Sequence, residues 1–277
     1  MEDLPQPAAS DGEEDGDGAK EDGDGGGGGE DAFLDAGDVE YTPYRPAKVR
    51  LSEVQMESIV YAGQQFAAPP PPGGERRGFM IGDGAGVGKG RQLAGIILDA
   101  WAQGYKRSVW ISISGDLWHD AKRDLSDINA TNIEVFNILG CSIDKDLTVG
   151  DGVVFSTYKS LTISKKTVRL SWIVSRLEQM TKWLGGETAE GCILFDEAHK
   201  AKNLYNKDKD SATVTGMKVK EFQELCPLAR VVYCSATPCS EPMNMGYMTR
   251  HVLGLWGEGT QFKDFSAFLK DIDGRCV

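Results

Sequence analysis

The sequence contains no hydrophobic run that approaches the roughly 18–20 residues of a membrane-spanning helix. Its first residues also lack the apolar segment of a secretory signal. Six cysteines are scattered between Cys141 and Cys276, and none belongs to the Cys-x-x-Cys pair that many zinc sites use. These absences predict a soluble intracellular protein whose cysteines are free thiols.

Basic residues are nearly absent from positions 1–40, which hold 15 acidic residues and a single lysine, Lys20. The rest of the chain holds 27 acidic and 29 basic residues, so the net charge of −12 comes from this first segment. Residues 1–40 are rich in Gly, Asp and Glu, which predicts a disordered acidic arm. The arm either keeps the protein soluble or contacts basic partners such as histones, and the sequence does not separate the two.

A glycine-rich stretch follows the first strongly apolar run. Residues 82–90 read Gly-Asp-Gly-Ala-Gly-Val-Gly-Lys-Gly, the apolar residues 78–81 precede them, and a helical pattern runs from Arg91 to Ala100. Strand, glycine loop ending in Gly-Lys, and helix are the context of a phosphate-binding loop. Glycines let successive backbone N–H groups point at one phosphate, and the helix N-terminus adds the positive end of its dipole.

This loop defines the predicted nucleotide contacts. Lys89 would reach the β- and γ-phosphates, and the backbone before it would surround them. The stretch predicted to contact the nucleotide consists of Gly84, Ala85, Gly86, Val87, Gly88, Lys89, Gly90 and Arg91. Asp83 replaces the usual first Gly, and Gly90 replaces the Ser or Thr whose hydroxyl binds Mg²⁺. We therefore expect Mg²⁺ to depend more on a carboxylate elsewhere and on water.

Two adjacent carboxylates follow a second apolar run. Residues 192–195 predict a buried strand that delivers Asp196 and Glu197 at its carboxyl end. Asp196 is the predicted metal ligand, and Glu197 would orient and deprotonate the attacking water. Together with Lys89 these are the predicted catalytic residues. An exposed charged turn is the alternative interpretation, which the phosphate loop upstream disfavours.

Two further positions are candidates for the same site. Ser235 and Thr237 follow the apolar residues 230–234, so their hydroxyls would lie at the carboxyl end of another strand, close to the acidic pair. Gln55 lies near the start of a helix that Ser52 would cap. Its amide matches the N6 and N7 edge of adenine, and an ordinary exposed glutamine is the equally weighted alternative.

The apolar patterns predict alternating strands and helices. Expected strands span residues 78–81, 108–113, 133–136, 152–156, 192–195 and 230–234. Expected helices begin at residue 51 and span residues 91–100, 116–125, 168–184 and 214–225, with amphipathic helical character within 244–272. Continuous apolar strands favour a mostly parallel sheet covered on both faces. Residues 41–277 are therefore predicted to form one three-layer α/β domain.

In this order, the motifs resemble those of superfamily 2 helicase-like ATPases. Gln55 matches the adenine-reading glutamine and Lys89 the phosphate-loop lysine. Residues 196–199 (Asp-Glu-Ala-His) match the DEAH box, and residues 235–237 (Ser-Ala-Thr) match the motif that couples hydrolysis to nucleic-acid movement. The resemblance implies a RecA-like lobe, a coupling role for His199, and nucleic-acid contact by Thr157-Tyr158.

The chain resembles the strawberry notch family of transcription co-regulators more closely still. The resemblance covers residues 41–272 and is carried by residues 82–91, 201–204, 241–245 and 255–260. Asp83 is shared with the Swi/Snf-type branch, and Gly after Lys89 is typical of the family. Ala198 stands where the family usually has Cys, and Pro238-Cys239 where Gly-Ala is usual. Neither difference removes a charged catalytic group.

The resemblance implies ATP and Mg²⁺ as cofactors, chromatin or nucleic acid and transcription factors as partners, and a location in the nucleus, alone or also in the cytoplasm. Such ATPases need a second RecA-like lobe whose arginines complete the site, and we expect that lobe to be absent from this chain. The isolated chain is therefore expected to bind nucleotide with little turnover.

A non-catalytic protein-interaction module is the alternative function. The expected absence of a second lobe favours it, and so does the near-neutral charge of residues 41–277, because no strong basic patch argues for autonomous DNA binding. A P-loop kinase or GTPase is disfavoured, since the guanine-reading Asn-Lys-x-Asp is missing.

Overall fold

The structure is a computed structural model that describes residues 51–70, 74–166, 173–204, 213–237, 241–250, 256 and 260–275. All of them belong to one compact unit, Leu34–Val277. The predicted acidic arm, residues 1–40, lies outside the described residues. Among the described helices, none combines the length and the apolar character that a bilayer crossing requires.

Six parallel strands form the main sheet. In sheet order they are β1 (Phe79–Ile81), β8 (Arg230–Cys234), β7 (Cys192–Asp196), β2 (Arg107–Ser112), β4 (Gly152–Thr157) and β3 (Val135–Asn137). Every residue of β4 and β8 is buried, as their continuous apolar sequences require of strands covered on both faces. The predicted parallel sheet is confirmed.

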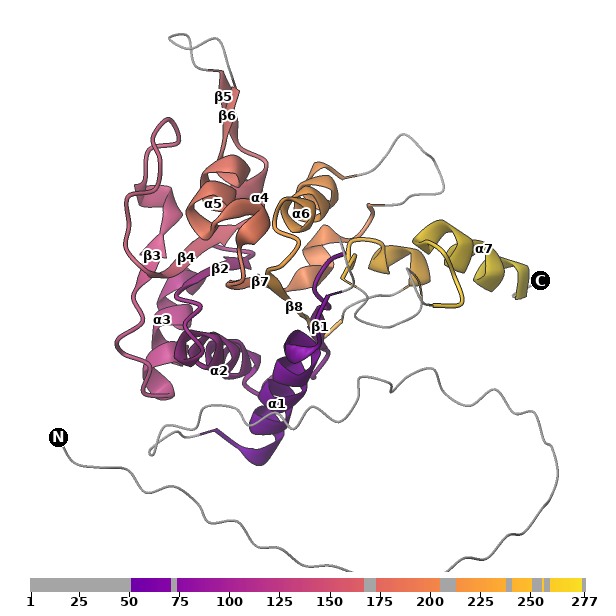
Figure 1. Cartoon of the computed structure of the whole chain (residues 1–277), viewed down its shortest axis with the longest axis horizontal. Helices are drawn as coiled ribbons and strands as arrows, with labels where there is room; N and C mark the ends of the chain where they lie inside the picture. The colour runs from indigo at the N-terminus through magenta and orange to yellow at the C-terminus, as the bar shows by residue number, and fades with distance from the viewer. Residues whose placement is uncertain are drawn as a thin grey trace, which may run out of the picture. The chain divides into compact units, whose positions relative to one another are not determined.

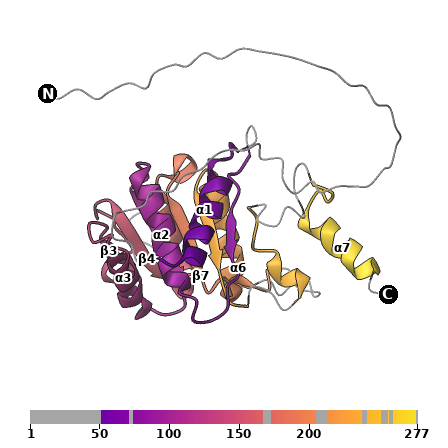
Figure 2. The same ribbon diagram turned by 90° about the horizontal axis from the view of Figure 1, so that it is seen from below.

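Helices cover both faces of this sheet (Figures 1 and 2). One layer consists of α1 (Glu53–Ala67), α2 (Lys89–Ala102) and α3 (Leu117–Asp127), and the other of α4 (Tyr158–Leu161), α5 (Arg176–Leu184) and α6 (Val214–Leu225). Neighbouring residues of β2 point to opposite faces of the sheet. Trp110 packs with the layer of α1, α2 and α3, whereas Val109 and Ile111 pack with the layer of α4, α5 and α6. This is the predicted three-layer α/β fold.

Short elements complete the chain. They are the 3₁₀ turns η1 (Ile138–Gly140), η2 (Gly186–Thr188), η3 (Ala198–Ala201) and η4 (Pro242–Met245), and the last helix, α7 (Phe265–Arg275). Phe265 and Phe268 of α7 pack against Trp256. The helical character expected within 244–272 is therefore confined, among the described residues, to η4 and α7, and residues 251–255 and 257–259 lie outside the description.

One predicted helix begins later than expected. Residues 168–184 were expected to be helical, but β5 (Ser164–Lys166) and β6 (Ile173–Ser175) form an antiparallel pair, and α5 begins only at Arg176. Ser175 caps α5 by accepting from the amide of Glu178, whose side chain accepts from the amide of Ser175 in return. This reciprocal capping box fixes the helix start and leaves the preceding residues to the strand. Residues 167–172 lie outside the description.

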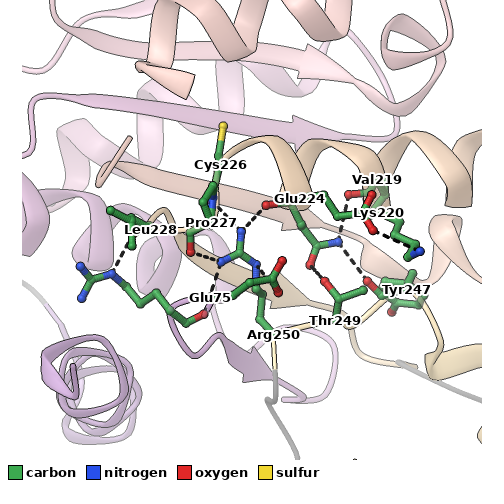
Figure 3. Close-up of polar contacts among 12 residues, drawn as sticks. Glu75, Val219, Lys220, Glu224, Cys226, Pro227, Leu228, Tyr247, Thr249 and Arg250 are labelled. Atoms are coloured by element: carbon green, nitrogen blue, oxygen red, sulfur yellow. Dashed lines mark hydrogen bonds and ion pairs between the residues drawn. The ribbon is translucent and has the colours of Figure 1, made fainter. Parts of the chain in front are cut away.

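Arg250 fastens the segment after η4 to the C-terminal end of α6 (Figure 3). Its side chain is fully buried, and its guanidinium donates to the carbonyl oxygens of Gln223, Cys226 and Pro227. Each of these carbonyls also accepts from one backbone amide, so the guanidinium adds a second donor at the end of the helix and acts as a side-chain cap. The carbonyl of Arg250 in turn accepts from the amide of Gly78, just before β1.

Candidate nucleotide-binding site

The predicted phosphate loop, acidic pair and Ser-Ala-Thr segment all begin at one edge of the sheet. β1, β8 and β7 are adjacent, and their register aligns Ile81 with Cys234 and Cys234 with Asp196. The amide of Ser235 donates to the carbonyl of Ile81 at 3.0 Å. Open α/β sheets bind ligands at the carboxyl ends of their strands. The fold thus joins three motifs that lie far apart in the sequence.

The phosphate loop has the backbone conformation that its glycines predict. Gly86 and Gly88 have φ angles of 83° and 84°, in the left-handed region that favours glycine. Gly88 is the N-cap of α2, so the loop leads directly into a helix N-terminus. Nζ of Lys89 lies 3.2 Å from the carbonyl oxygen of Asp83 and 2.9 Å from that of Gly84 and donates to both. The ammonium group therefore lies within the loop that would surround a phosphate.

Gln92 of α2 holds the start of this loop. It was not among the predicted site residues. Its side chain is fully buried, and its Nε2 donates to Oδ2 of Asp83 at 2.7 Å. Asp83, which replaces the usual first Gly, thereby ties the start of the loop to α2. A polar residue beside the apolar stripe of α2, next to Leu93, was the only signal in the sequence.

Gln55 is buried, so the interpretation of it as an exposed glutamine is wrong. It forms a capping box with Ser52 at the start of α1, and its Nε2 donates to the carbonyl of Val87 at 2.9 Å. A Cβ atom at Gly88 would lie 2.4 Å from this Nε2, so α1 and the loop fit together only with glycine there. Gln55 holds the phosphate loop, and its contact with adenine stays a prediction.

The acidic pair is positioned by Ser112 of β2 and Tyr158 of α4. Oδ2 of Asp196 accepts from the hydroxyl of Ser112, the last residue of β2, at 2.8 Å. The hydroxyl of Tyr158 donates to the main-chain carbonyl of Asp196 at 2.9 Å. Burial raises the pKa of Asp196 above its ordinary value, although the Ser112 bond opposes this shift. Ser112 and Tyr158 were not predicted as partners of Asp196.

Glu197 follows in a left-handed conformation, with φ 51° and ψ 48°. Such a backbone is uncommon for a residue with a side chain, and residues held this way cluster at functional sites. Its carboxylate is half-buried at the sheet edge rather than extended into solvent. The geometry therefore disfavours the exposed charged turn.

The three predicted coupling residues lie together. Nδ1 of His199 is 3.0 Å from the hydroxyl of Ser235 and 3.3 Å from Oε2 of Glu197. The same Ser235 hydroxyl accepts from the amide of Thr237 at 3.1 Å. A continuous polar path thus runs from the acidic pair to the segment after β8. That this path couples nucleotide state to another surface stays a prediction.

The buried thiol of Cys234 lies where these charged groups meet. Burial raises its pKa far above the ordinary value, and the charges of Asp196, Glu197 and Asp83 raise it further while that of Lys89 lowers it. Cys234 ends β8 between Ile81 of β1 and Asp196 of β7, so its thiol lies between the start of the phosphate loop and the acidic pair.

Two other predicted positions have different surroundings. Arg91 forms an ion pair with Asp127 of α3 at 2.7 Å, so its guanidinium has a partner on the protein. Thr157 and Tyr158, which were expected to contact nucleic acid, are both buried. Their side chains support the acidic pair and the start of α4, and nucleic-acid contact by this segment stays a prediction.

The residues at this edge fit a magnesium–nucleotide complex. Within the described part of the chain, no three His, Cys, Asp or Glu side chains are grouped closely enough to hold a metal ion by themselves. Mg²⁺ in nucleotide sites is typically held by one or two carboxylates together with phosphate oxygens. Asp196, at the same edge as the glycine loop and Lys89, supplies such a carboxylate.

Comparison with known proteins agrees with this geometry. The family model described as "P-loop containing NTP hydrolase pore-1" matches residues 35–277. The chain is 49% identical over 232 residues to protein strawberry notch of Drosophila melanogaster, an alignment that covers 82% of this chain and 14% of that protein. It is 47% identical over 232 residues to human strawberry notch homolog 1, covering 82% of this chain and 16% of the relative.

A plant relative and a solved structure extend the comparison. Protein FORGETTER 1 of Arabidopsis thaliana is 48% identical over 227 residues, covering 80% of this chain and 17% of its own length. The chain thus spans less than a fifth of each of these relatives. The SWI2/SNF2 ATPase core of Sulfolobus solfataricus in complex with double-stranded DNA superposes with a TM-score of 0.54 at 17% identity, covering 83% of this chain and 41% of that one. The chain therefore belongs to the P-loop containing NTP hydrolase pore-1 family, and it has the fold of a RecA-like lobe of the strawberry notch kind.

Proposed function

We propose that this chain binds Mg²⁺-ATP at the carboxyl edge of β1, β8 and β7. The observation that carries the proposal is the path of close polar contacts Glu197–His199–Ser235, and the amide of Ser235 donates to the carbonyl of Ile81, the residue before the phosphate loop. This path joins the acidic pair to the loop across two neighbouring strands. Such a path is not expected if residues 196–199 form only an exposed charged turn.

The residues take distinct roles in this proposal. Lys89 moves its ammonium from the loop carbonyls to the β- and γ-phosphates, and the exposed backbone of residues 84–87 surrounds them. Asp196 holds Mg²⁺, which neutralises phosphate charge when it is bound. Glu197 orients the attacking water and accepts its proton.

We further propose that the isolated chain hydrolyses ATP slowly. Arginines supplied from outside a phosphate-loop lobe typically accelerate hydrolysis by roughly 10³–10⁵. The chain matches less than a fifth of the relatives named above, so their complete activities need not belong to it alone. Robust turnover by this chain that Lys89→Ala abolishes would contradict the proposal.

Nucleic acid is the proposed partner of the full architecture. The DNA-bound SWI2/SNF2 core, which shares the fold, supports it. A role in transcriptional regulation on chromatin, with transcription-factor partners and a nuclear location, rests on the family resemblance of the motifs.

Thermal melting with and without Mg²⁺-ATP tests the binding site. Ligand at about 100 times its Kd stabilises a protein by about 2.7 kcal/mol. That gain corresponds to roughly 5–10 °C for a lobe of this size. We expect this shift for the unaltered chain and a much smaller one for Lys89→Ala. No shift at millimolar Mg²⁺-ATP would overturn the proposal and favour the alternative, a non-catalytic protein-interaction module.

A further inference from the structure

Gly90 is the position at which the phosphate loop lacks its usual hydroxyl, and a carboxylate lies against it. A Cβ atom built on Gly90 would be 2.0 Å from Oδ2 and 2.9 Å from Cγ of Asp124. The side chain of a Ser or Thr at residue 90 would project into this space. Asp124 of α3 thus places an oxygen close to where the missing hydroxyl would stand.

Two contacts fix α3 beside the first turn of α2. Arg91 pairs with Asp127 at 2.7 Å, and Asp124 contacts Gly90 one helical turn earlier on α3. Residues three apart on a helix share one face, so Asp124 and Asp127 both point toward α2. The packing of the two helices therefore places Asp124 beside Gly90, with its side chain mostly buried.

The carboxylate of Asp124 has little compensation from the protein. Its side chain is only 14% exposed, and its ion pair with Arg123 is 3.8 Å long. Arg123 also pairs with Asp120 at 2.7 Å and is largely exposed, so its charge is shared and screened. A buried carboxylate without a close cation is costly unless another cation approaches it.

We propose that Asp124 takes the place of the phosphate-loop hydroxyl and supplies an oxygen, directly or through water, to the Mg²⁺ of the bound nucleotide. This inference rests on the proposed function. Hard oxygen donors are the ligands that Mg²⁺ prefers, and a carboxylate is a stronger donor than a hydroxyl. Gly90 is then required because no side chain can share the space that Asp124 fills.

A purely structural role for Asp124 makes a different prediction. A carboxylate near a helix N-terminus can stabilise the helix dipole, which needs no metal. In that case the loss of the charge would lower the stability of the nucleotide-free protein and leave the Mg²⁺ dependence of nucleotide binding unchanged.

The test is titration of the full chain with a fluorescent ADP analogue, in the presence of Mg²⁺ and in the presence of EDTA. The measured quantity is the ratio of the two dissociation constants. For the unaltered chain we expect Mg²⁺ to tighten binding. For Asp124→Asn we expect that gain to fall by about tenfold or more, the loss typical of altered metal surroundings.

Two further variants sharpen the experiment. Asp124→Ala combined with Gly90→Ser restores a conventional hydroxyl and should recover most of the Mg²⁺ gain that Asp124→Ala alone loses. Asp120→Asn removes a charge from the same helix, one turn away and paired with Arg123, and should leave the gain unchanged.

The outcomes separate the two proposals. If Asp124→Asn and Asp120→Asn give the same Mg²⁺ gain as the unaltered chain while Lys89→Ala abolishes binding, the role of Asp124 is refuted and the nucleotide site stands. If the unaltered chain binds the ADP analogue neither with Mg²⁺ nor with EDTA, the proposed function fails and this inference falls with it.

Discussion

The hydroxyl of Tyr158 donates a hydrogen bond to the main-chain oxygen of Asp196, 2.9 Å away. Tyr158 begins α4 directly after β4, whereas Asp196 ends β7. The bond crosses the carboxyl edge of the sheet, because β2 lies between these two strands. Tyr158 thereby holds the first residue of the acidic pair.

Tyr158→Phe should weaken both the fold and the site. The buried carbonyl of Asp196 loses its donor, which costs about 1–2 kcal/mol of stability. We expect the melting temperature to fall by roughly 2–4 °C for each kcal/mol lost. The Kd for Mg²⁺-nucleotide should rise by about tenfold, because a group that orients the proposed metal ligand is lost.

Tyr233→Phe is the matched control. Tyr233 is fully buried, and its hydroxyl bonds to Gln223 of α6, which the Arg250 cap holds. Its removal should cost similar stability and leave nucleotide affinity unchanged. Equal effects of the two substitutions on affinity would show that Tyr158 acts only through general stability.

Much of the fold could be predicted because its strands carry a strong local signal. Continuous apolar runs marked the buried strands, and β8 and α6 have the predicted bounds. The start of α5 could not be read from apolar spacing, since residues 168–184 contain apolar positions at helical intervals throughout. The Ser175 to Glu178 capping box, a signal present in the sequence, decides that boundary.

The site was predictable where each motif is contiguous along the chain. Lys89, Asp196 and Ser235 each follow an apolar strand, and parallel strands bring their carboxyl ends to one edge. The contacts between Tyr158 and Asp196 and between Gly90 and Asp124 join residues more than 30 positions apart. No local pattern marks such a pair, because helix packing and strand order alone create it.

Asp124→Asn should stabilise the nucleotide-free protein at neutral pH. Burial raises the pKa of Asp124 to about 6, above its ordinary value of 3.8. The native state therefore binds this proton more tightly than the unfolded state, so stability falls as pH rises from about 4 to about 6. Asparagine does not ionise, so Asp124→Asn avoids this loss of stability at neutral pH.

Melting curves between pH 4 and pH 7 check the sign of this effect. We expect Asp124→Asn to melt several degrees above the unaltered chain at pH 7, and the difference to shrink toward pH 4. A variant that melts lower at pH 7 would contradict the prediction and support a stabilising contact between Asp124 and the N-terminus of α2.

Arg250→Leu should destabilise the protein severely. The guanidinium is fully buried, donates to three carbonyls at the end of α6 and lies 3.6 Å from Glu75 (Figure 3). Without it, each of these oxygens loses one of its donors and the Glu75 carboxylate loses a nearby cation, at a cost of about 3–5 kcal/mol. Urea unfolding measures this loss.

Lysine should not rescue this position, because an ammonium lacks the planar fork that reaches several carbonyls at once. We expect Arg250→Lys to lose most of the same stability. Arg123→Lys, at an exposed ion pair with Asp120, is the control and should cost less than about 1 kcal/mol. Similar costs at the two positions would contradict the buried cap.

The thiols should differ in reactivity. Burial raises the pKa of Cys192 and of Cys226 to about 11, so almost no thiolate forms there at pH 8. Cys141 is half-exposed. In mass spectrometry of iodoacetamide-treated protein, we expect Cys141 to be labelled and the other two to be labelled only in urea. Rapid labelling of Cys192 in the folded protein would contradict its burial.

The contact between Gly90 and Asp124 makes the two positions interdependent during sequence change. Gly90→Ser alone would bring its side chain into the carboxylate, and Asp124→Ala alone would leave an unfilled space beside the loop. Gly90→Ser is therefore costly while Asp124 stays, and Asp124→Ala first leaves the loop with neither the carboxylate nor a hydroxyl, although the double change restores a conventional phosphate loop. A chain of this kind has no easy mutational route back to the hydroxyl-bearing loop, because both positions must change together.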